Sequence, residues 1–222
     1  AIITRTGPKV RGMKGCKKII AEVPTFDMPP WRGQPRQRDF TLDELRAILV
    51  ETRCMTTPKG CDGPTWWRAF ILTAYHTGLR ISALMQLRRE HLGGDGWLDV
   101  ADGISKGGAG IRLWLHGDAA AALNRLAAGA SPRLLPWPGI ERHGISNLRC
   151  RWKRLLSIAG IAENRRFGFH SIRKATAMAL HRVDPLAAGI VLGHARSVTD
   201  VHYLDRERIL AEAIGKMERL VA

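Results

Sequence analysis

The sequence predicts an α+β domain that is mainly helical and carries a small antiparallel β-sheet or hairpin on one side. Most segments between turn signals read as helices, whereas residues 97–100 and 111–115 read as short strands. Glycines at 107, 108 and 110 favour a turn between these two strands. With 222 residues and 45% hydrophobic content, the chain can bury a large core. We expect one domain over residues 39–222, preceded by a basic arm or linker over residues 1–38.

The arm is rich in proline, glycine and basic residues and has no sustained helical or strand periodicity. Its only acidic residues are Glu22 and Asp27. A basic arm that contacts a polyanion and a disordered, solvated segment both fit this composition.

Three helices are expected in the first half of the domain. Thr41 and Glu44 form a capping-box pattern before an apolar series, which predicts a helix over residues 41–53. The apolar run 66–75 predicts a helix that ends at Gly78, because glycine suits the left-handed C-terminal position. Trp66 and Trp67 lie in that run and are expected in the core, although stacking on bases is an alternative. A further helix is expected over residues 81–90.

The second half of the domain also reads as helical. Asp118 is a candidate cap of an alanine-rich helix that ends near Gly129. Helices are then expected over residues 145–159, 170–182 and 185–192, with Asp184 as the cap and Pro185 in the first turn of the last one. A final helical stretch follows Val198.

The formal net charge of +15 favours a polyanionic partner, and nucleic acid is favoured over an anionic membrane surface. No apolar run is long enough to span a bilayer and no signal peptide is evident, so we expect a cytoplasmic, nucleoid-associated protein. The four cysteines support neither a disulfide framework nor a zinc site. No carboxylate or thiol joins the histidines at ligand spacing, so neither a metal ion nor a cofactor is expected. The histidines weighed are His91, His116, His143, His181 and His202.

Several residues suit the cutting of a phosphodiester without a metal ion. The chain has two tyrosines, and Tyr75 falls inside an apolar helix, which leaves Tyr203 as the candidate nucleophile for a covalent 3′-phosphotyrosine. Arg80 and Arg173 offer permanently charged, forked donors for the phosphate oxygens. His170, three residues before Arg173, can accept the tyrosine proton.

Two further candidates complete this set of catalytic residues. Lys106, in the glycine-flanked hairpin turn, is the candidate general acid for the leaving 5′ oxygen. His194 follows Leu192 and Gly193 and is expected to donate a hydrogen bond to the phosphate, since glycine allows close backbone approach.

In order and spacing, these motifs resemble the catalytic domain of the tyrosine recombinases, or phage-type integrases. The resemblance covers residues 40–222. It implies an enzyme that cuts and rejoins double-stranded DNA without a metal ion or nucleotide, as a tetramer that assembles on two duplexes. The motifs are Thr77-Gly78-Leu79-Arg80-Ile81-Ser82, Lys106 with Gly108 and Arg112, His170-Ser171-Ile172-Arg173, Leu192-Gly193-His194, and Tyr203 nine residues later.

The chain departs from the family pattern at three points. Ala83 stands where members usually have an acidic residue, three positions after Arg80, and Ile172 stands where leucine is common. The usual helical core-binding domain is not evident upstream, so we expect either a fragment, with residues 1–38 as its remnant, or a member that lacks half of the DNA clamp.

Two surfaces have alternative interpretations. A basic series, which either contacts DNA or forms a solvated helix face, consists of Arg149, Arg151, Lys153 and Arg154. An apolar stripe, which either docks on a neighbouring protomer in a homo-tetramer or packs on its own domain, consists of Leu210, Ile214, Met217 and Val221.

The expected function is therefore site-specific DNA recombination or integration. A topoisomerase IB-like relaxase shares this chemistry without a synapse, and a catalytically silent DNA-binding module is the alternative from another class.

Overall fold

The computed structural model describes residues 39–58, 60–104, 110–127, 131–139, 144–161, 168–192 and 205–221. These residues belong to one compact unit that spans Gln37–Ala222. The predicted basic arm lies outside the described residues, and so do Lys106, His194 and Tyr203. No helix in the described part of the chain is both long enough and apolar enough to cross a membrane.

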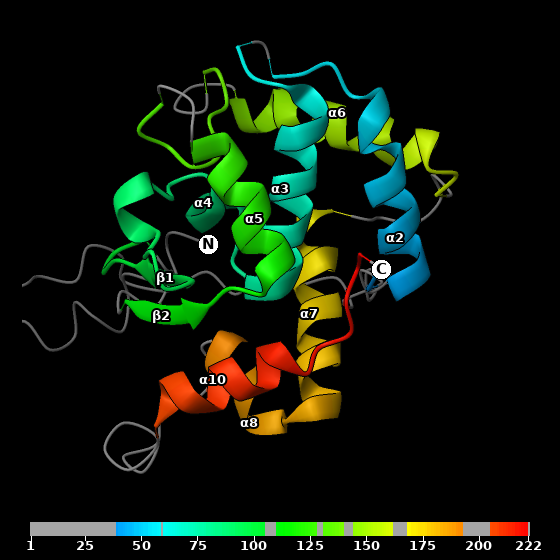
Figure 1. Ribbon diagram of the computed structural model, residues 1–222. Coiled ribbons are helices and arrows are strands. Elements are labelled where there is room, and N and C mark those ends of the chain that lie inside the picture. The colour runs from blue at the N-terminus through cyan, green and yellow to red at the C-terminus, as the bar shows by residue number, and fades with distance from the viewer. Residues whose placement is uncertain are drawn as a thin grey trace, which may run out of the picture. The chain divides into compact units, whose positions relative to one another are not determined.

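The described elements are mainly helical and include one two-stranded sheet, so the predicted α+β fold class is confirmed (Figure 1). They are α2 (Leu42–Glu51), η1 (Thr52–Cys54), α3 (Gly63–Thr77), α4 (Ile81–Leu84), η2 (Arg89–His91), β1 (Trp97–Val100), β2 (Ile111–Trp114), α5 (Gly117–Ala127), α6 (Gly144–Ile158), α7 (Phe169–Val183), α8 (Pro185–Leu192) and α10 (Arg206–Gly215).

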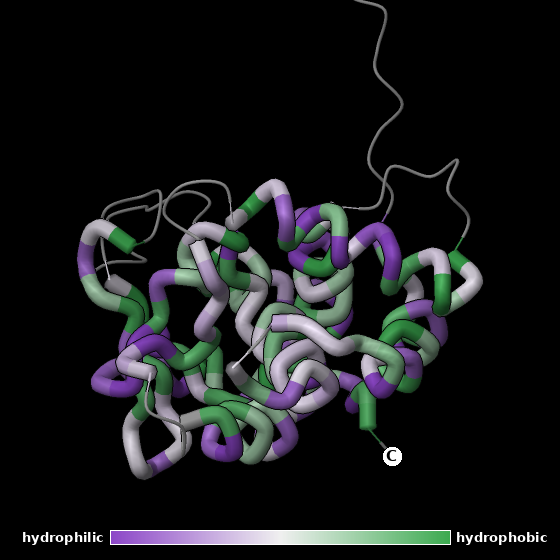
Figure 2. The backbone as a smooth tube through the Cα atoms, turned by 90° about the horizontal axis from the view of Figure 1, so that it is seen from above, coloured by the Kyte–Doolittle hydropathy of each residue, from purple (hydrophilic) through white to green (hydrophobic). Residues whose placement is uncertain are grey.

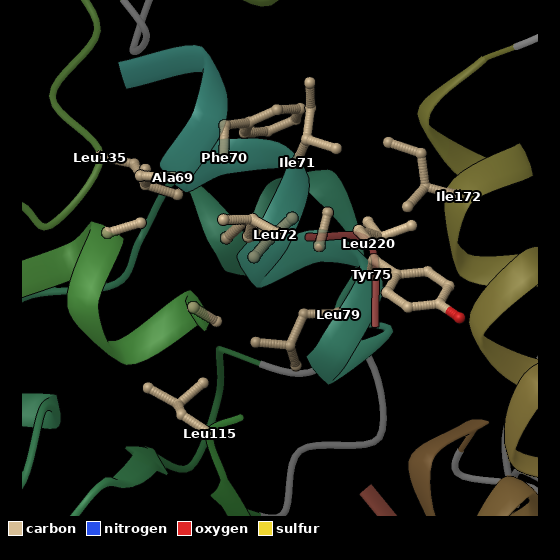
Figure 3. Close-up of a cluster of buried hydrophobic side chains, with 14 of the residues drawn as sticks. Ala69, Phe70, Ile71, Leu72, Tyr75, Leu79, Leu115, Leu135, Ile172 and Leu220 are labelled. Atoms are coloured by element: carbon tan, nitrogen blue, oxygen red, sulfur yellow. The ribbon is translucent and has the colours of Figure 1, made fainter. Parts of the chain in front are cut away.

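Helix α3 is the centre of the core and is buried on nearly all sides. The Asp62 side chain caps its start by accepting a hydrogen bond from the Thr65 N–H at 2.9 Å. Helix α3 packs against α5, α7 and α2, and an all-round apolar surface is what such a position requires. Figure 3 shows its apolar side chains beside those of neighbouring segments: Phe70, Ile71, Leu72 and Tyr75 from α3, with Leu115, Leu135 and Ile172 around them.

Tryptophans join α6 to α3. Trp66 and Trp67 are fully buried, which confirms their predicted place in the core. The Trp67 ring stacks on Trp152 of α6 with the ring centroids 6.2 Å apart, and the Trp66 ring lies 4.8 Å from Trp137. Burial of such large rings contributes strongly to the stability of the domain.

The two strands pair antiparallel as predicted, with Trp97 opposite Trp114 and Val100 opposite Ile111. The link between them runs from residue 101 to residue 110, and residues 105–109 lie outside the described part. Hydrophilic and hydrophobic residues are interspersed along the backbone (Figure 2), as expected for helices that bury one face in a core.

Two sequence-based expectations were wrong. Helix α4 ends at Leu84, well before residue 90. The following backbone instead pairs with a distant segment: Arg89 donates to the Pro132 carbonyl and Leu134 donates to the Leu87 carbonyl, both at 3.0 Å. The second error concerns the start of α5. Asp118 lies within the first turn of that helix, and its carboxylate binds Arg219.

The apolar stripe after the predicted nucleophile packs on its own domain in this structure. Leu210, Ile214 and Met217 are all buried, and Val221 is half-buried. Asp205 caps α10 by accepting a hydrogen bond from the Arg208 N–H at 3.0 Å.

Candidate active site

The first turn of α7 presents two of the predicted catalytic residues. Gly168 precedes the helix in an extended conformation, and its N–H donates to the Ser171 hydroxyl at 3.3 Å. Ile172 is 1% exposed and packs in the core. Isoleucine therefore serves as a core residue at this position, where leucine is common in the family. On the same turn, His170 is exposed and Arg173 is 5% exposed.

Arg173 joins three of the predicted motifs. Its guanidinium donates to the Gly78 carbonyl through Nη1 and to the Leu192 carbonyl through Nη2, the latter at 2.8 Å. Two of its five N–H donors are used in this way, which leaves three donors for a ligand. The arginine therefore fixes the end of α3 and the end of α8 relative to the start of α7.

Gly78 makes this close approach possible. It ends α3 in the left-handed conformation with φ of 59°, as predicted. A Cβ at this position would lie 2.8 Å from Val191 Cγ1 and 3.1 Å from Thr176 Cγ2, so a larger residue would push α8 and α7 away. The Thr176 hydroxyl also donates to the Tyr75 carbonyl at 2.7 Å, which holds α7 against α3.

Arg80 lies in the short link after α3 and is the residue immediately before α4. Its backbone carbonyl accepts hydrogen bonds from Ala83 and Leu84, both at 2.9 Å. Ala83 is buried and supplies no charge to its neighbour. Among the described residues, no carboxylate forms an ion pair with Arg80 or Arg173.

The charges of this site act on one another. Burial, together with the charge of Arg80, lowers the pKa of Arg173 to about 10. His170 is exposed overall, but partial desolvation by its neighbours lowers its pKa, and the charges of Arg173, Lys174 and Arg80 lower it further. A site in which Arg80 and Arg173 have no carboxylate partner among the described residues favours binding of an anion, because the anion relieves the repulsion between the two arginines. It also keeps His170 neutral and able to accept a proton.

Tyr75 is a core residue, as the sequence predicted. It is 2% exposed, and its hydroxyl donates to the Glu218 carbonyl at 3.3 Å. Burial and the charge of Glu218 raise its pKa to about 12, which makes its phenolate hard to form. Tyr203 is the other tyrosine of the chain.

The predicted basic series lies on α6, opposite the face that packs on the core. Leu148 and Trp152 are buried on the inner face, whereas Arg149, Lys153 and Arg154 are exposed and Arg151 is half-buried. Three of the four basic side chains are therefore exposed to solvent. This exposure is required both for a DNA contact and for a solvated helix face, so both interpretations stand.

The structure groups two histidines and a carboxylate that the sequence analysis did not associate. His76, His116 and Asp118 each place a potential ligand atom within 4.8 Å of the others, and Asp118 Oδ2 lies 3.3 Å from His116 Nδ1. However, the two imidazoles are stacked at 12°, so their in-plane lone pairs do not converge on one point. Arg219 also holds the Asp118 carboxylate at 2.7 Å. The group is therefore a poor metal site.

Comparison with known proteins gives the family. The family model described as the phage integrase family matches residues 40–208, whereas no curated protein matches the chain. Among solved structures, the integrase of mycobacterium phage Brujita is 19% identical with a TM-score of 0.65, and the match covers 86% of this chain and 62% of that one. This chain therefore spans less than two thirds of the Brujita integrase.

Two lambda integrase structures have the same fold. The match to its catalytic core has 23% identity and a TM-score of 0.56, and it covers 73% of this chain and 94% of that one. The match to a lambda integrase tetramer bound to a Holliday junction has 20% identity and a TM-score of 0.56, and it covers 79% and 50%. The family match over residues 40–208, together with this shared fold, confirms the resemblance found in the sequence: the chain belongs to the phage integrase family of tyrosine recombinases.

Proposed function

We propose that this protein is a site-specific DNA recombinase or integrase that cuts and rejoins strands through a 3′-phosphotyrosine. The observation that carries the proposal is the cluster of Arg80, His170 and Arg173, in which the charge of Arg80 lowers the pKa values of Arg173 and His170 and no described carboxylate forms an ion pair with either arginine. A phosphodiester supplies the missing negative charge and has two non-bridging oxygens for the two guanidinium groups.

Each step of the reaction has a candidate residue. The Tyr203 hydroxyl attacks the phosphorus and gives its proton to His170, while the bond to the 5′ oxygen breaks and Lys106 protonates that leaving oxygen. Arg80, Arg173 and His194 hold the phosphate oxygens as their charge rises. Religation reverses these steps, with a 5′ hydroxyl attacking the phosphotyrosine. No metal ion or cofactor takes part in this proposal.

The proposed partner is double-stranded DNA. The net charge of +15 and the three exposed basic residues of α6 support it. Because lambda integrase forms a tetramer on a Holliday junction, we extend the proposal to a homo-tetramer on DNA through the C-terminal helix, acting on the nucleoid in the cytoplasm. The stripe of Leu210, Ile214 and Met217 is buried against its own domain here, so this tetramer requires α10 to exchange partners or to use its outer face.

A nicked suicide duplex tests the chemistry, because loss of a short 5′ fragment traps the covalent complex. We expect a protein–DNA adduct that resists denaturation, forms in EDTA and is absent for Tyr203→Phe. Tyr75→Phe is the matched control. It removes the chain's other phenol, whose hydroxyl bonds only the Glu218 carbonyl in the described structure, and the adduct should persist.

The same assay decides between the proposal and a silent DNA-binding module, which the uncharged Ala83 beside Arg80 favours. If the wild-type protein binds the duplex as tightly as Tyr203→Phe but gives no adduct, the protein is a binder and not a strand transferase.

A further inference from the structure

Arg112 on β2 binds three carboxylates at once, one with each guanidinium nitrogen. Its Nε lies 3.3 Å from Asp99, its Nη2 lies 3.3 Å from Asp95, and its Nη1 lies 3.2 Å from Glu207. The guanidinium carbon also sits over the Trp97 ring, 4.9 Å from the centroid. With every nitrogen engaged, the guanidinium has a defined place and orientation.

The three carboxylates come from different parts of the fold. Asp99 lies directly opposite Arg112 in the β1–β2 ladder, and Asp95 lies in the turn before β1, so both bonds stay within the hairpin. Glu207 instead belongs to the first turn of α10. Of these three ion pairs, the Arg112–Glu207 pair is therefore the one that joins the hairpin to another element.

Helix α10 lies against β2 (Figure 1). At the far end of the helix, a Cβ built on Gly215 would be 3.7 Å from the Trp114 ring. The backbone at the C-terminal end of α10 thus lies close to Trp114 of β2, and the Arg112–Glu207 ion pair joins the N-terminal end of the helix to the same strand.

Arg112 and Glu207 each follow, in the sequence, one of the two residues that transfer protons or bonds in the proposed reaction. Glu207 comes four residues after Tyr203, and Arg112 comes six residues after Lys106. Links of four and six residues span at most about 14 Å and 21 Å, so fixing Arg112 to Glu207 limits how far the nucleophile and the acid can separate.

We propose that Arg112 and Glu207 are positioning residues, which set the place of the Tyr203 segment relative to the Lys106 hairpin. This proposal rests on the proposed function, because it assigns the bond a role in that reaction. The pair is about half exposed to solvent. Its loss should therefore slow cleavage by about threefold rather than abolish it, which is what an ion pair of this exposure can supply.

The test compares Glu207→Ala with two variants that each remove an ion pair of the same kind. Asp99→Asn removes a carboxylate from Arg112 within the hairpin, and Glu212→Gln removes the partner of Arg208 within α10, at 2.9 Å. We expect Glu207→Ala to slow adduct formation on the suicide duplex at saturating DNA by about threefold. The two control variants should cleave at the wild-type rate, and all three should bind DNA as the wild type does.

A double-mutant cycle gives the second readout. In an Arg112→Met background, Glu207→Ala should cause no further slowing, because the bond is already lost. The idea fails if Glu207→Ala slows cleavage equally in both backgrounds, or if Glu207→Ala cleaves at the wild-type rate.

Hydrogen exchange without DNA separates this proposal from the proposed function. Glu207→Ala should speed exchange of the α10 amides that follow its first turn, and Asp99→Asn should not. A wild-type protein that gives no adduct refutes strand transfer, and the positioning role falls with it. Unchanged exchange in Glu207→Ala, with an active wild type, refutes the positioning role alone.

Discussion

The guanidinium of Arg173 donates to the Leu192 carbonyl oxygen at 2.8 Å, across 19 residues of sequence. This bond is paired with the one to Gly78, so one side chain supports two of the segments that carry predicted catalytic residues.

Replacing Arg173 with lysine should therefore reduce both stability and chemistry. A single ammonium group cannot reach both carbonyls in the same fork geometry, and a buried carbonyl left without a donor costs about 1–3 kcal/mol. We expect a loss of that size in urea unfolding and a decrease in adduct formation of about 10²-fold or more. Arg182→Lys, at an exposed position of the same helix, is the control and should change stability by less than about 0.5 kcal/mol.

Gly78→Ala should destabilise the domain by about 2 kcal/mol or more, since the left-handed backbone and the contact with Val191 both oppose a Cβ. Gly94→Ala is the matched control, because a Cβ there meets nothing within 4 Å. Thermal and urea unfolding measure the difference. Equal stability of the two variants would show that α8 does not pack on Gly78 in solution.

His76 should make the domain sensitive to acid. Burial, with the charge of His116, lowers its pKa from 6.5 to about 3, and both ring nitrogens lack a hydrogen-bond partner among the described residues. Between these values the unfolded chain takes up a proton that the folded protein does not. The contribution of the neutral His76 to stability is therefore fully present above pH 6.5. Below that pH the free energy of unfolding decreases by up to about 1.4 kcal/mol per pH unit.

His76→Phe should flatten this dependence, measured as the free energy of unfolding from pH 7 to pH 4. His181→Gln, at an exposed position, is the control and should keep the wild-type slope. If the slope survives in His76→Phe, another group is responsible for the acid sensitivity.

The pH dependence of cleavage should report on His170. Its pKa lies below the ordinary 6.5 because of burial and the nearby arginines, so the free protein holds a neutral imidazole at pH 7. With DNA below saturation, the cleavage rate should stay level from pH 8 to pH 6.5 and decline in acid, since a protonated His170 cannot accept the tyrosine proton. His170→Asn should be slower by about 10²–10⁴-fold and lack this decline. A wild-type rate that falls between pH 8 and 6.5 would contradict the assignment.

The exposed face of α6 should contribute to DNA affinity through phosphates. A combined Arg149→Gln, Lys153→Gln and Arg154→Gln variant should bind duplex DNA more weakly. The slope of log affinity against log salt should decrease by about 0.9 for each lost phosphate contact. Arg125→Gln, an exposed change on α5, is the control for net charge. An unchanged slope in the triple variant would identify this surface as a solvated helix face.

Local signals in the sequence predicted much of the fold. The Thr41–Glu44 capping box and the left-handed Gly78 are properties of a few neighbouring residues, and both occur as expected. The motif around Arg80 could be recognised in the same way, because Gly78 marks the end of the helix before it, whereas Arg173 was recognised from its place three residues after His170. The placement of Lys106, His194 and Tyr203 stays a prediction.

Relations between distant segments could not be predicted. The pairing of Arg89 with Pro132 ended the expected helix early, and nothing within residues 81–90 encodes a partner more than 40 positions away. The Asp118–Arg219 bond has the same character: Asp118 is a plausible cap by local rules, but the C-terminal segment takes its carboxylate. Arg112 was noted in the sequence only beside Lys106, and its bond to Glu207 emerges from the fold.

The tryptophan core has a consequence for spectroscopy. Trp66, Trp67 and Trp137 lie with ring centroids 4.8 to 5.8 Å apart, close enough for their electronic transitions to couple. Such coupling adds bands to the far-ultraviolet circular dichroism spectrum, so a helical content calculated from that spectrum will be wrong. The same bands will vanish when the core loosens, which gives an optical signal of side-chain packing that is separate from the signal of the helices.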